Sequence, residues 1–336
     1  MVNYIPVIAA VVAFIVTAAL GFPFIPYLKK LKYGQTILED GPKWHKSKEG
    51  TPTMGGIMMV AGSLVGIALS ITLYVTLSPN FAFDKQTIVY IAGVVFSLLC
   101  CVIGLLDDYI KVVKKRNLGL TAKQKTAMQL FATLAYLLTL AFAGVNETWI
   151  PFMKENLDIT KGFGLIFWPV SFVFIYFMVN AVNLTDGIDG LASSVTMVAA
   201  CAFMLICTAT PFSLISSFAA IIAGTCVGFV LWNAKPAKVF MGDTGSMFLG
   251  GAIVSLGFGC EKPILLLPIG IVYIAEALSV VLQVASFKLT GKRIFKMSPI
   301  HHHFEMSGWS EDKICLIFTA VTILGCIPAV VVAYFL

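Results

Sequence analysis

The chain carries a succession of apolar stretches, most of them long enough to cross a lipid bilayer. The hydrocarbon layer is about 30 Å thick, so a crossing helix needs roughly 20 predominantly apolar residues. With 59% hydrophobic and only 12% charged residues, the composition also lies outside the range of soluble domains. We therefore expect an all-α integral membrane protein with about ten transmembrane helices. The predicted helices are Ile5–Leu28, Gly55–Leu77, Ile88–Leu106, Thr126–Gly144, Gly164–Asn180, Leu191–Thr208, Ile215–Trp232, Met247–Cys260, Ile264–Ser286 and Ile314–Leu336.

The connections between these stretches are short, so residues 1–336 are predicted to form one polytopic membrane domain. The first stretch lacks a basic n-region and a convincing small-residue cleavage site, which indicates a retained helix and not a signal peptide. The eight cysteines lie in or beside apolar stretches. Their spacing predicts neither a disulfide framework nor a zinc site.

Basic residues are distributed very unevenly between the two sets of loops that alternate along such a chain. One set holds only Lys85, Lys154, Lys161 and Lys262, and all the remaining lysines and arginines fall in the other. Loops rich in lysine and arginine stay in the cytoplasm. Both termini are therefore expected on the extracytoplasmic side.

Five polar motifs all fall in the basic loops. They are TPTMGG (51–56), LLDDYIKVVKKR (105–116), NLTDGIDG (183–190), WNAKPAKVFMGDTGS (232–246) and MSPIHHHFE (297–305). Chance would scatter such motifs over both faces of the membrane. Their convergence predicts one active site on the cytoplasmic face, assembled from several loops.

Four aspartates, Asp107, Asp108, Asp186 and Asp243, stand near predicted helix ends among many lysines. Carboxylates brought together raise one another's pKa unless a cation lies between them. Oxygen ligands without a His/Cys set favour Mg2+ or Mn2+ over Zn2+, and Mg2+ commonly combines one or two carboxylates with substrate phosphates. Lysines beside such a centre suit a polyphosphate substrate. The pattern indicates a magnesium-dependent reaction of a phosphorylated substrate.

Each of these motifs also has a purely structural interpretation. The Asp107–Asp108 pair is compatible with a solvated helix cap, the GDTGS segment with a turn, and most lysines with orientation of the chain. Three adjacent histidines point in different directions, so they do not form a metal site by themselves. Glu276, an acid inside a predicted membrane helix, is a functional candidate without an assigned role, and His45 is expected to have none.

Four motifs in this order, IGLLDDYIKVVKKR, NAVNLTDGIDGLA, WNAKPAKVFMGDTGS and MSPIHHHFE, resemble those of the phospho-N-acetylmuramoyl-pentapeptide transferases of bacterial peptidoglycan synthesis. The resemblance covers essentially the whole chain. That family belongs to the polyprenyl-phosphate N-acetylhexosamine-1-phosphate transferases. The resemblance implies Mg2+-dependent transfer of phospho-MurNAc-pentapeptide from UDP-MurNAc-pentapeptide to undecaprenyl phosphate, which gives lipid I and UMP. It also implies a multi-pass protein of the bacterial cell membrane and a homodimer, and no nucleic-acid partner is expected.

Within this framework the candidate residues receive roles. Asp107, Asp108 and Asp243 are the predicted catalytic residues, and Asp243, Asp186 and Asp108 are the predicted magnesium ligands. Phe240 is predicted either to stack on uracil or to anchor the loop at the membrane interface. The full set expected to bind nucleotide or substrate is Lys48, Lys111, Lys125, Asn180, Asn183, Asp186, Asp189, Asn233, Phe240, His301, His302 and His303.

Two other functions remain open at this point. A sister enzyme that transfers GlcNAc-1-phosphate shares the aspartate motifs, but MSPIHHHFE resembles the muramoyl-pentapeptide branch. An ion-coupled secondary transporter is the more distant alternative. It would place its acids near the middle of the membrane spans, whereas the clustered acids here lie at the predicted cytoplasmic ends.

Overall fold

The computed structural model describes residues 4–31, 48, 50–78, 83–114, 118–208 and 213–335. His45 and several of the basic loop residues used above, among them Lys43, Lys46, Lys115 and Arg116, lie outside these ranges. The elements are α1 (Ile5–Lys30), α2 (Gly56–Leu77), α3 (Lys85–Val113), α4 (Ala122–Phe142), β1 (Glu147–Thr148), β2 (Leu157–Asp158), η3 (Gly162–Ile166), α5 (Phe167–Thr185), α6 (Leu191–Thr208), α7 (Ser213–Asn233), α8 (Gly242–Gly259), η4 (Pro263–Leu265), α9 (Leu266–Ile269), α10 (Ile271–Thr290), α11 (Ile300–Glu305) and α12 (Glu311–Phe335).

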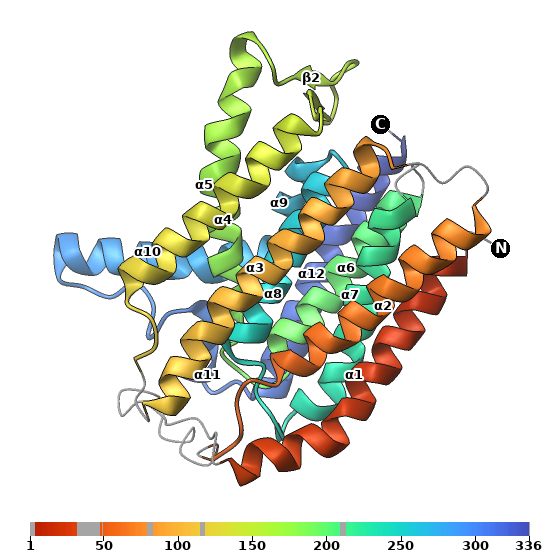
Figure 1. The fold of residues 1–336 in the computed structure, drawn as a ribbon. Helices are drawn as coiled ribbons and strands as arrows, with labels where there is room; N and C mark the ends of the chain where they lie inside the picture. Colours follow the sequence, from red (N-terminus) through yellow and green to blue (C-terminus); the bar gives the residue numbers. More distant parts are fainter. Residues whose placement is uncertain are drawn as a thin grey trace.

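The helices form a bundle whose composition confirms the prediction of a helical integral membrane protein (Figure 1). Among the described residues, nine helices are long and apolar enough to cross a membrane. The start of α1 and the end of α12 lie at one end of the bundle, and α3 ends at the opposite one (Figure 1). The two-residue strands β1 and β2 pair antiparallel in the connection between α4 and α5.

Helix α8 is as long as α6, but it is not apolar enough to count as a membrane-crossing helix, and its burial explains why. Every residue from Thr244 to Gly259 is buried inside the protein. Its small residues let neighbours approach closely: a Cβ on Gly251 would lie 2.8 Å from the Cα of Ser97 in α3. Because protein and not lipid surrounds α8, the helix needs no continuous apolar surface.

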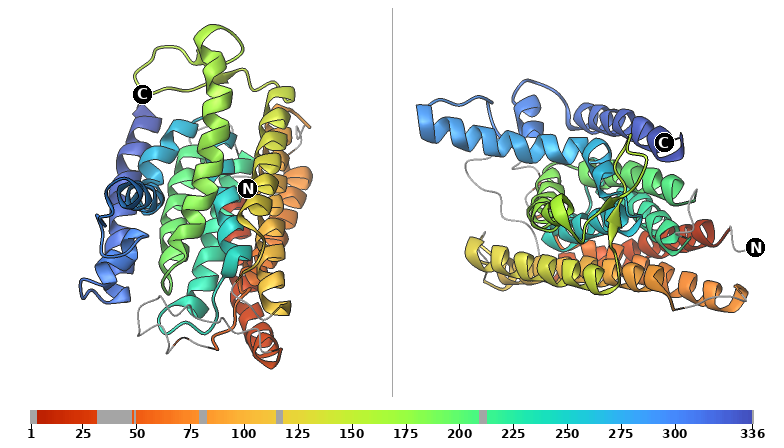
Figure 2. Two further views of the ribbon diagram at one scale, coloured as in Figure 1. Left: turned by 90° about the vertical axis from the view of Figure 1, so that its left-hand side faces the viewer. Right: turned by 90° about the horizontal axis from the view of Figure 1, so that it is seen from above.

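The predicted helix Ile264–Ser286 is not continuous in the structure. The chain passes through η4 and α9, turns at Gly270 and begins α10 at Ile271. Pro268 has no amide hydrogen to donate within a helix, which weakens the helix at this point. Helix α10 runs across the direction of the bundle, and its far end projects away from the other helices (Figure 2).

Several of the polar motifs that we expected in loops are partly helical, and two of them carry the acidic residues. Helix α3 continues to Val113, so Asp107 and Asp108 belong to its last turns. Helix α8 begins at Gly242, so Asp243 lies in its first turn. These helix ends, and not free loops, position the acidic residues.

Candidate active site

The end of α3 and the start of α8 bring three carboxylates together. One oxygen from each of Asp107, Asp108 and Asp243 can be chosen so that all lie within 4.8 Å of one another. Gly104 makes this approach possible, because a Cβ at this position would overlap the backbone carbonyl of Asp243. The sequence places a glycine where the two helices touch, one turn before the paired aspartates. We refer to these three residues as the carboxylate cluster.

Asp108 closes the first turn of α8. Its Oδ1 accepts a hydrogen bond from the amide of Asp243 at 3.1 Å, and its Oδ2 accepts from the amide of Thr244 at 2.9 Å. The Thr244 hydroxyl donates to the same Oδ2 at 2.7 Å. The first amide groups of a helix lack partners within it and favour negative charge. Asp108 therefore supplies from α3 a cap for α8.

Two lysines hold the other two carboxylates. The Nζ atom of Lys111 lies 2.6 Å from Asp107 Oδ2 and 3.1 Å from Asp243 Oδ2. Lys125, at the start of α4, lies 2.8 Å from Asp243 Oδ2. Burial alone would raise the pKa of Asp243, but the positive charges of Lys125 and Lys111 hold it well below its ordinary value. Asp243 is therefore a carboxylate at neutral pH.

The asparagines of the NAVNLTDG segment have different partners. The amide of Asn183 donates to Asp243 Oδ1 at 3.0 Å and to Ser246 Oγ at 2.7 Å. Asn180 instead exchanges two hydrogen bonds of 3.2 Å with Gln129 of α4.

The half-buried Asp186 follows α5 outside the carboxylate cluster. Desolvation and the negative charges of Asp243 and Asp108 raise its pKa well above the ordinary value.

A second polar cluster forms around Lys48. Its Nζ lies 2.7 Å from Asp189 Oδ1 and 2.6 Å from Glu311 Oε2. Burial would lower the pKa of Lys48, but the hydrogen bonds to Asp189 and Glu311 raise it overall. Glu311 also accepts from the Asp189 amide at 3.3 Å and lies 3.6 Å from Lys235. Lys48, Asp189 and Glu311 are called the Lys48 cluster below.

Sequence reasoning missed Glu311. In the segment SEDK an acid at the start of a helix has an ordinary role, because it complements the helix dipole. Only the fold shows that Glu311 is buried and contacts residues more than a hundred positions away.

The WNAKPAKVF segment is fixed to its surroundings mainly by backbone groups. Asn233 accepts from the Gly190 amide and donates to the Val239 carbonyl, both at 3.0 Å. The amide of Phe240 donates to the Pro52 carbonyl at 2.8 Å, and the Phe240 carbonyl accepts from Gly55 at 2.8 Å. These bonds join three of the polar motifs. The side chain of Phe240 is half-buried.

The three histidines lie in the short helix α11 and point to different partners. His301 is buried, and its Nδ1 lies 3.0 Å from Oε1 of Glu276. His302 pairs with Glu305 at 2.6 Å, and Nδ1 of His303 accepts from the Lys296 amide at 3.1 Å. None of them belongs to the carboxylate cluster among the described residues.

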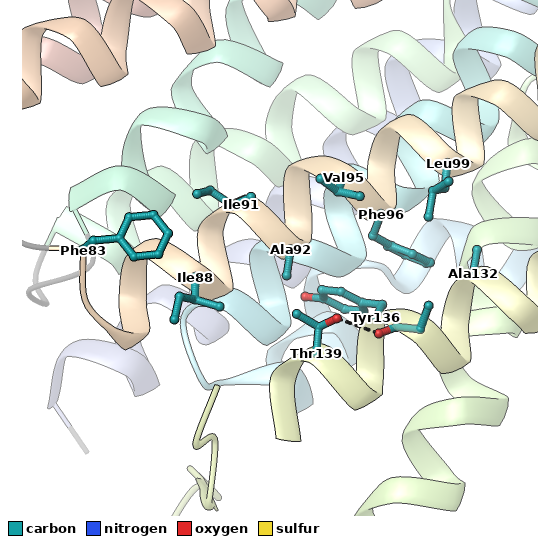
Figure 3. A pocket seen from close by; sticks show the side chains of 11 residues that line it. Phe83, Ile88, Ile91, Ala92, Val95, Phe96, Leu99, Ala132, Tyr136 and Thr139 are labelled. Carbon is teal, nitrogen blue, oxygen red and sulfur yellow. Dashed lines mark hydrogen bonds between the residues drawn. The ribbon is translucent and has the colours of Figure 1, made fainter. Parts of the chain in front are cut away.

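An apolar cavity of about 310 Å³ lies between α3 and α4 (Figure 3). Its walls include Ile91, Val95 and Phe96 of α3 and Tyr136 and Thr139 of α4. The cavity lies several turns before the aspartates along α3, and no charged side chain lines it. The cavity is therefore separate from the polar site.

The buried α8, the carboxylate cluster and the flanking lysines define a class: a membrane protein with an acidic centre suited to a phosphorylated substrate. Consistent with this class, residues 90–259 match the family described as glycosyl transferase family 4. This match includes the carboxylate cluster and both asparagines of the NAVNLTDG segment.

Relatives that match nearly the whole chain identify the family within this class. The chain is 42% identical to a phospho-N-acetylmuramoyl-pentapeptide-transferase of Halalkalibacterium halodurans, with 98% of each chain covered. It is 44% identical to the enzyme of that name from Heliobacterium modesticaldum (96% of this chain, 97% of the relative) and to that from Bacillus mycoides (94% of each). The chain therefore belongs to the phospho-N-acetylmuramoyl-pentapeptide-transferase family. It is a phospho-sugar transferase of peptidoglycan synthesis.

Proposed function

We propose that this enzyme transfers phospho-MurNAc-pentapeptide from UDP-MurNAc-pentapeptide to undecaprenyl phosphate, with release of UMP and formation of lipid I. The carboxylate cluster with its two lysines is the observation that carries the proposal, because it is an arrangement suited to a diphosphate substrate. The relatives' printed names support the muramoyl-pentapeptide as the transferred group. The basic loops favour the cytoplasmic face of a bacterial cell membrane for the reaction.

The carboxylate cluster also suits the magnesium ion that we propose as cofactor. Asp107, Asp108 and Asp243 offer several oxygen atoms within a short distance, and oxygen is the ligand that Mg2+ prefers. Asp186, close enough for Asp243 and Asp108 to raise its pKa, is proposed as a further ligand. When bound, Mg2+ would neutralise charge on the diphosphate and on the leaving UMP.

The lysines have a related role in the proposed reaction. Lys111 and Lys125 hold their ammonium groups beside Asp243 and are proposed to bind phosphate oxygens when the substrate is present. Asn183, which already donates to Asp243, is proposed to orient the diphosphate in the same way. Asn180, held by Gln129, is proposed to support that segment from α4.

The nucleotide end is proposed to lie at the Lys48 cluster. Asp189 is positioned there by Lys48, by the Ala237 amide and by Glu311, so that it can accept a hydrogen bond from uracil or ribose. Asn233 and Phe240 lie in the segment fixed beside it, with Phe240 as the proposed stacking partner of uracil. The histidines of α11, His301, His302 and His303, are proposed to serve the diphosphate or the sugar-peptide end.

We also propose that two copies of the chain form a homodimer.

The test uses purified protein in detergent with UDP-MurNAc-pentapeptide, undecaprenyl phosphate and MgCl2. We expect UMP release and a lipid-linked product, both abolished by chelation of the metal and by Asp243→Asn. Replacement of the donor by UDP-GlcNAc should give no product. Product from UDP-GlcNAc but not from the muramoyl donor would instead assign the GlcNAc-1-phosphate transferase activity.

A further inference from the structure

Glu276 is a buried acid in α10 whose partner is His301. The Glu276 side chain is fully buried, as is that of His301. The Glu276 carboxyl group meets the histidine twice: Oε1 lies 3.0 Å from Nδ1, and Oε2 accepts from the His301 backbone amide at 3.4 Å. An isolated buried charge is costly, so a buried acid with a fixed partner in a membrane helix is a functional candidate.

This contact fixes which way the imidazole faces. A carboxylate only accepts hydrogen bonds, so the proton on the Glu276 side belongs to Nδ1 of His301. The opposite ring atom, Nε2, is buried and has no hydrogen-bond partner in the structure. Buried polar atoms in folded proteins nearly always have a partner. An atom without one is therefore a candidate to bind a ligand.

The free edge of the ring is directed at the DGID segment. A Cβ on Gly187 would overlap Nε2 and Cε1 of His301, so only a glycine leaves room for the ring. Gly187 is itself exposed and stands between Asp186 and Asp189. Nε2 therefore packs directly against an exposed residue of the segment proposed to meet the substrate.

We propose that Glu276 is a positioning residue of the transferase site, which holds His301 by Nδ1 so that a protonated Nε2 donates a hydrogen bond to a phosphate oxygen of the substrate's diphosphate beside Gly187. Glu276 does not touch substrate in this assignment and acts only through His301. For this contact both ring nitrogens carry a proton: Nδ1–H donates to Glu276, and Nε2–H donates to the phosphate oxygen. This inference rests on the proposed function and deepens it.

The test exploits two replacements that each keep one end of the imidazole. His301→Asn keeps a donor near Nδ1 but removes the atom at Nε2, and we expect its kcat/KM to fall by about 10²-fold or more, as for loss of an electrostatic donor. His301→Gln reaches the position of Nε2 and should retain clearly more activity than His301→Asn.

Glu276→Gln still offers an oxygen to Nδ1–H and should retain more activity than Glu276→Leu, whose kcat/KM should fall about 10- to 100-fold.

A double-mutant cycle separates positioning from a merely structural role. If Glu276 acts through His301, the variant with both Glu276→Leu and His301→Asn should be no less active than His301→Asn alone. Ser279→Ala is the matched control, because Ser279 is a buried polar residue of α10 whose hydroxyl bonds to the Glu276 carbonyl. It should keep nearly full activity.

Three outcomes would overturn the inference: multiplication of the two losses in the double variant, equal activity of Glu276→Gln and Glu276→Leu, or full activity of Glu276→Leu. UMP release by the unaltered protein is measured first. Its absence would reject the proposed function itself, whereas normal release combined with any of these three outcomes would reject only the role of Glu276.

Discussion

Asp108 and Thr244 join two helices at the centre of the site: Oδ2 of Asp108 accepts from both the amide and the hydroxyl of Thr244, at 2.9 and 2.7 Å. The paired aspartates of α3 therefore differ in their surroundings. Asp108 has both oxygens engaged with the first turn of α8. Asp107 meets Lys111 with Oδ2 and accepts from the Leu120 amide with Oδ1 at 2.8 Å. Asp108 therefore joins α3 to the start of α8, whereas Asp107 lies beside Lys111 within the site.

Asp108→Asn should therefore lower stability as well as activity. The asparagine amide group would place an N–H donor against the amides of Asp243 or Thr244, and loss of a helix cap typically costs about 0.5–2 kcal/mol. We expect a lower midpoint of thermal unfolding in detergent together with reduced UMP release. Thr244→Val removes only the hydroxyl bond and should lower the midpoint less. A midpoint for Asp108→Asn equal to that of the unaltered protein would contradict the capping role.

Glu311→Gln should weaken binding of the nucleotide substrate while it leaves the chemical step largely intact. Glu311 holds Lys48 and the Asp189 amide, so loss of its charge weakens both contacts. Because a hydrogen bond to a charged group contributes about 1.5 kcal/mol or more, the KM for the UDP-sugar should rise roughly tenfold. Steady-state kinetics measure this change.

The adjacent Asp312 provides the control, because it is exposed at the same helix start. Asp312→Asn should leave KM unchanged. If Glu311→Gln lowers kcat by the same factor as kcat/KM, the Lys48 cluster acts in the transition state and not in nucleotide binding.

Cysteine labelling should place Lys114 and Asn146 on opposite sides of the membrane. Both residues are exposed, and α4 lies between them in the chain. The positive-inside rule assigns Lys114 to the cytoplasm. A maleimide that does not cross the membrane should label Lys114→Cys only in inverted vesicles and Asn146→Cys only in intact cells. Labelling of both from one side would show that α4 does not cross.

Much of the helical architecture could be predicted from the sequence, because hydropathy over twenty residues is a strong signal. The limits of α2 and α6 differ from the predicted stretches by at most one residue. Hydropathy does not identify a membrane helix that is surrounded by other parts of the protein instead of lipid, as α8 is. It also does not reveal how Pro268 and Gly270 divide the predicted ninth helix.

The site was accessible from sequence where motifs carried an unusual density of polar groups. Asp107, Asp108 and Asp243 could be grouped because acids at predicted helix ends share one face of the membrane. A contact between residues far apart in the sequence produces no such motif. Glu311 looks like an ordinary first-turn acid, and the partner of Glu276 is 25 residues away in a segment whose path depends on the turn after α10.

Asp107 is our candidate for the residue that steers the proton of the lipid phosphate. In the direct mechanism, an oxygen of that phosphate attacks the β-phosphorus, and the bond to UMP breaks as UMP leaves with the electron pair. A phosphate with a second pKa near 6 is already an anionic nucleophile, so it needs positioning and loss of a proton more than replacement by a carboxylate. The Nζ atom of Lys111, 2.6 Å from Oδ2 of Asp107, favours the charged form of that group, which is the form that can accept the proton.

Asp107→Asn should then lower kcat by roughly 10²–10⁴-fold, the range for loss of a general base. Binding of UDP-MurNAc-pentapeptide with Mg2+, measured by calorimetry, should survive in this variant, whereas Asp243→Asn should weaken both binding and turnover. Asp243 differs because it contacts Lys111, Lys125 and Asn183 at once. A sugar-phosphorylated Asp107 that forms with UMP release in the absence of lipid, and then passes its group to added undecaprenyl phosphate, would establish the covalent route in place of direct attack.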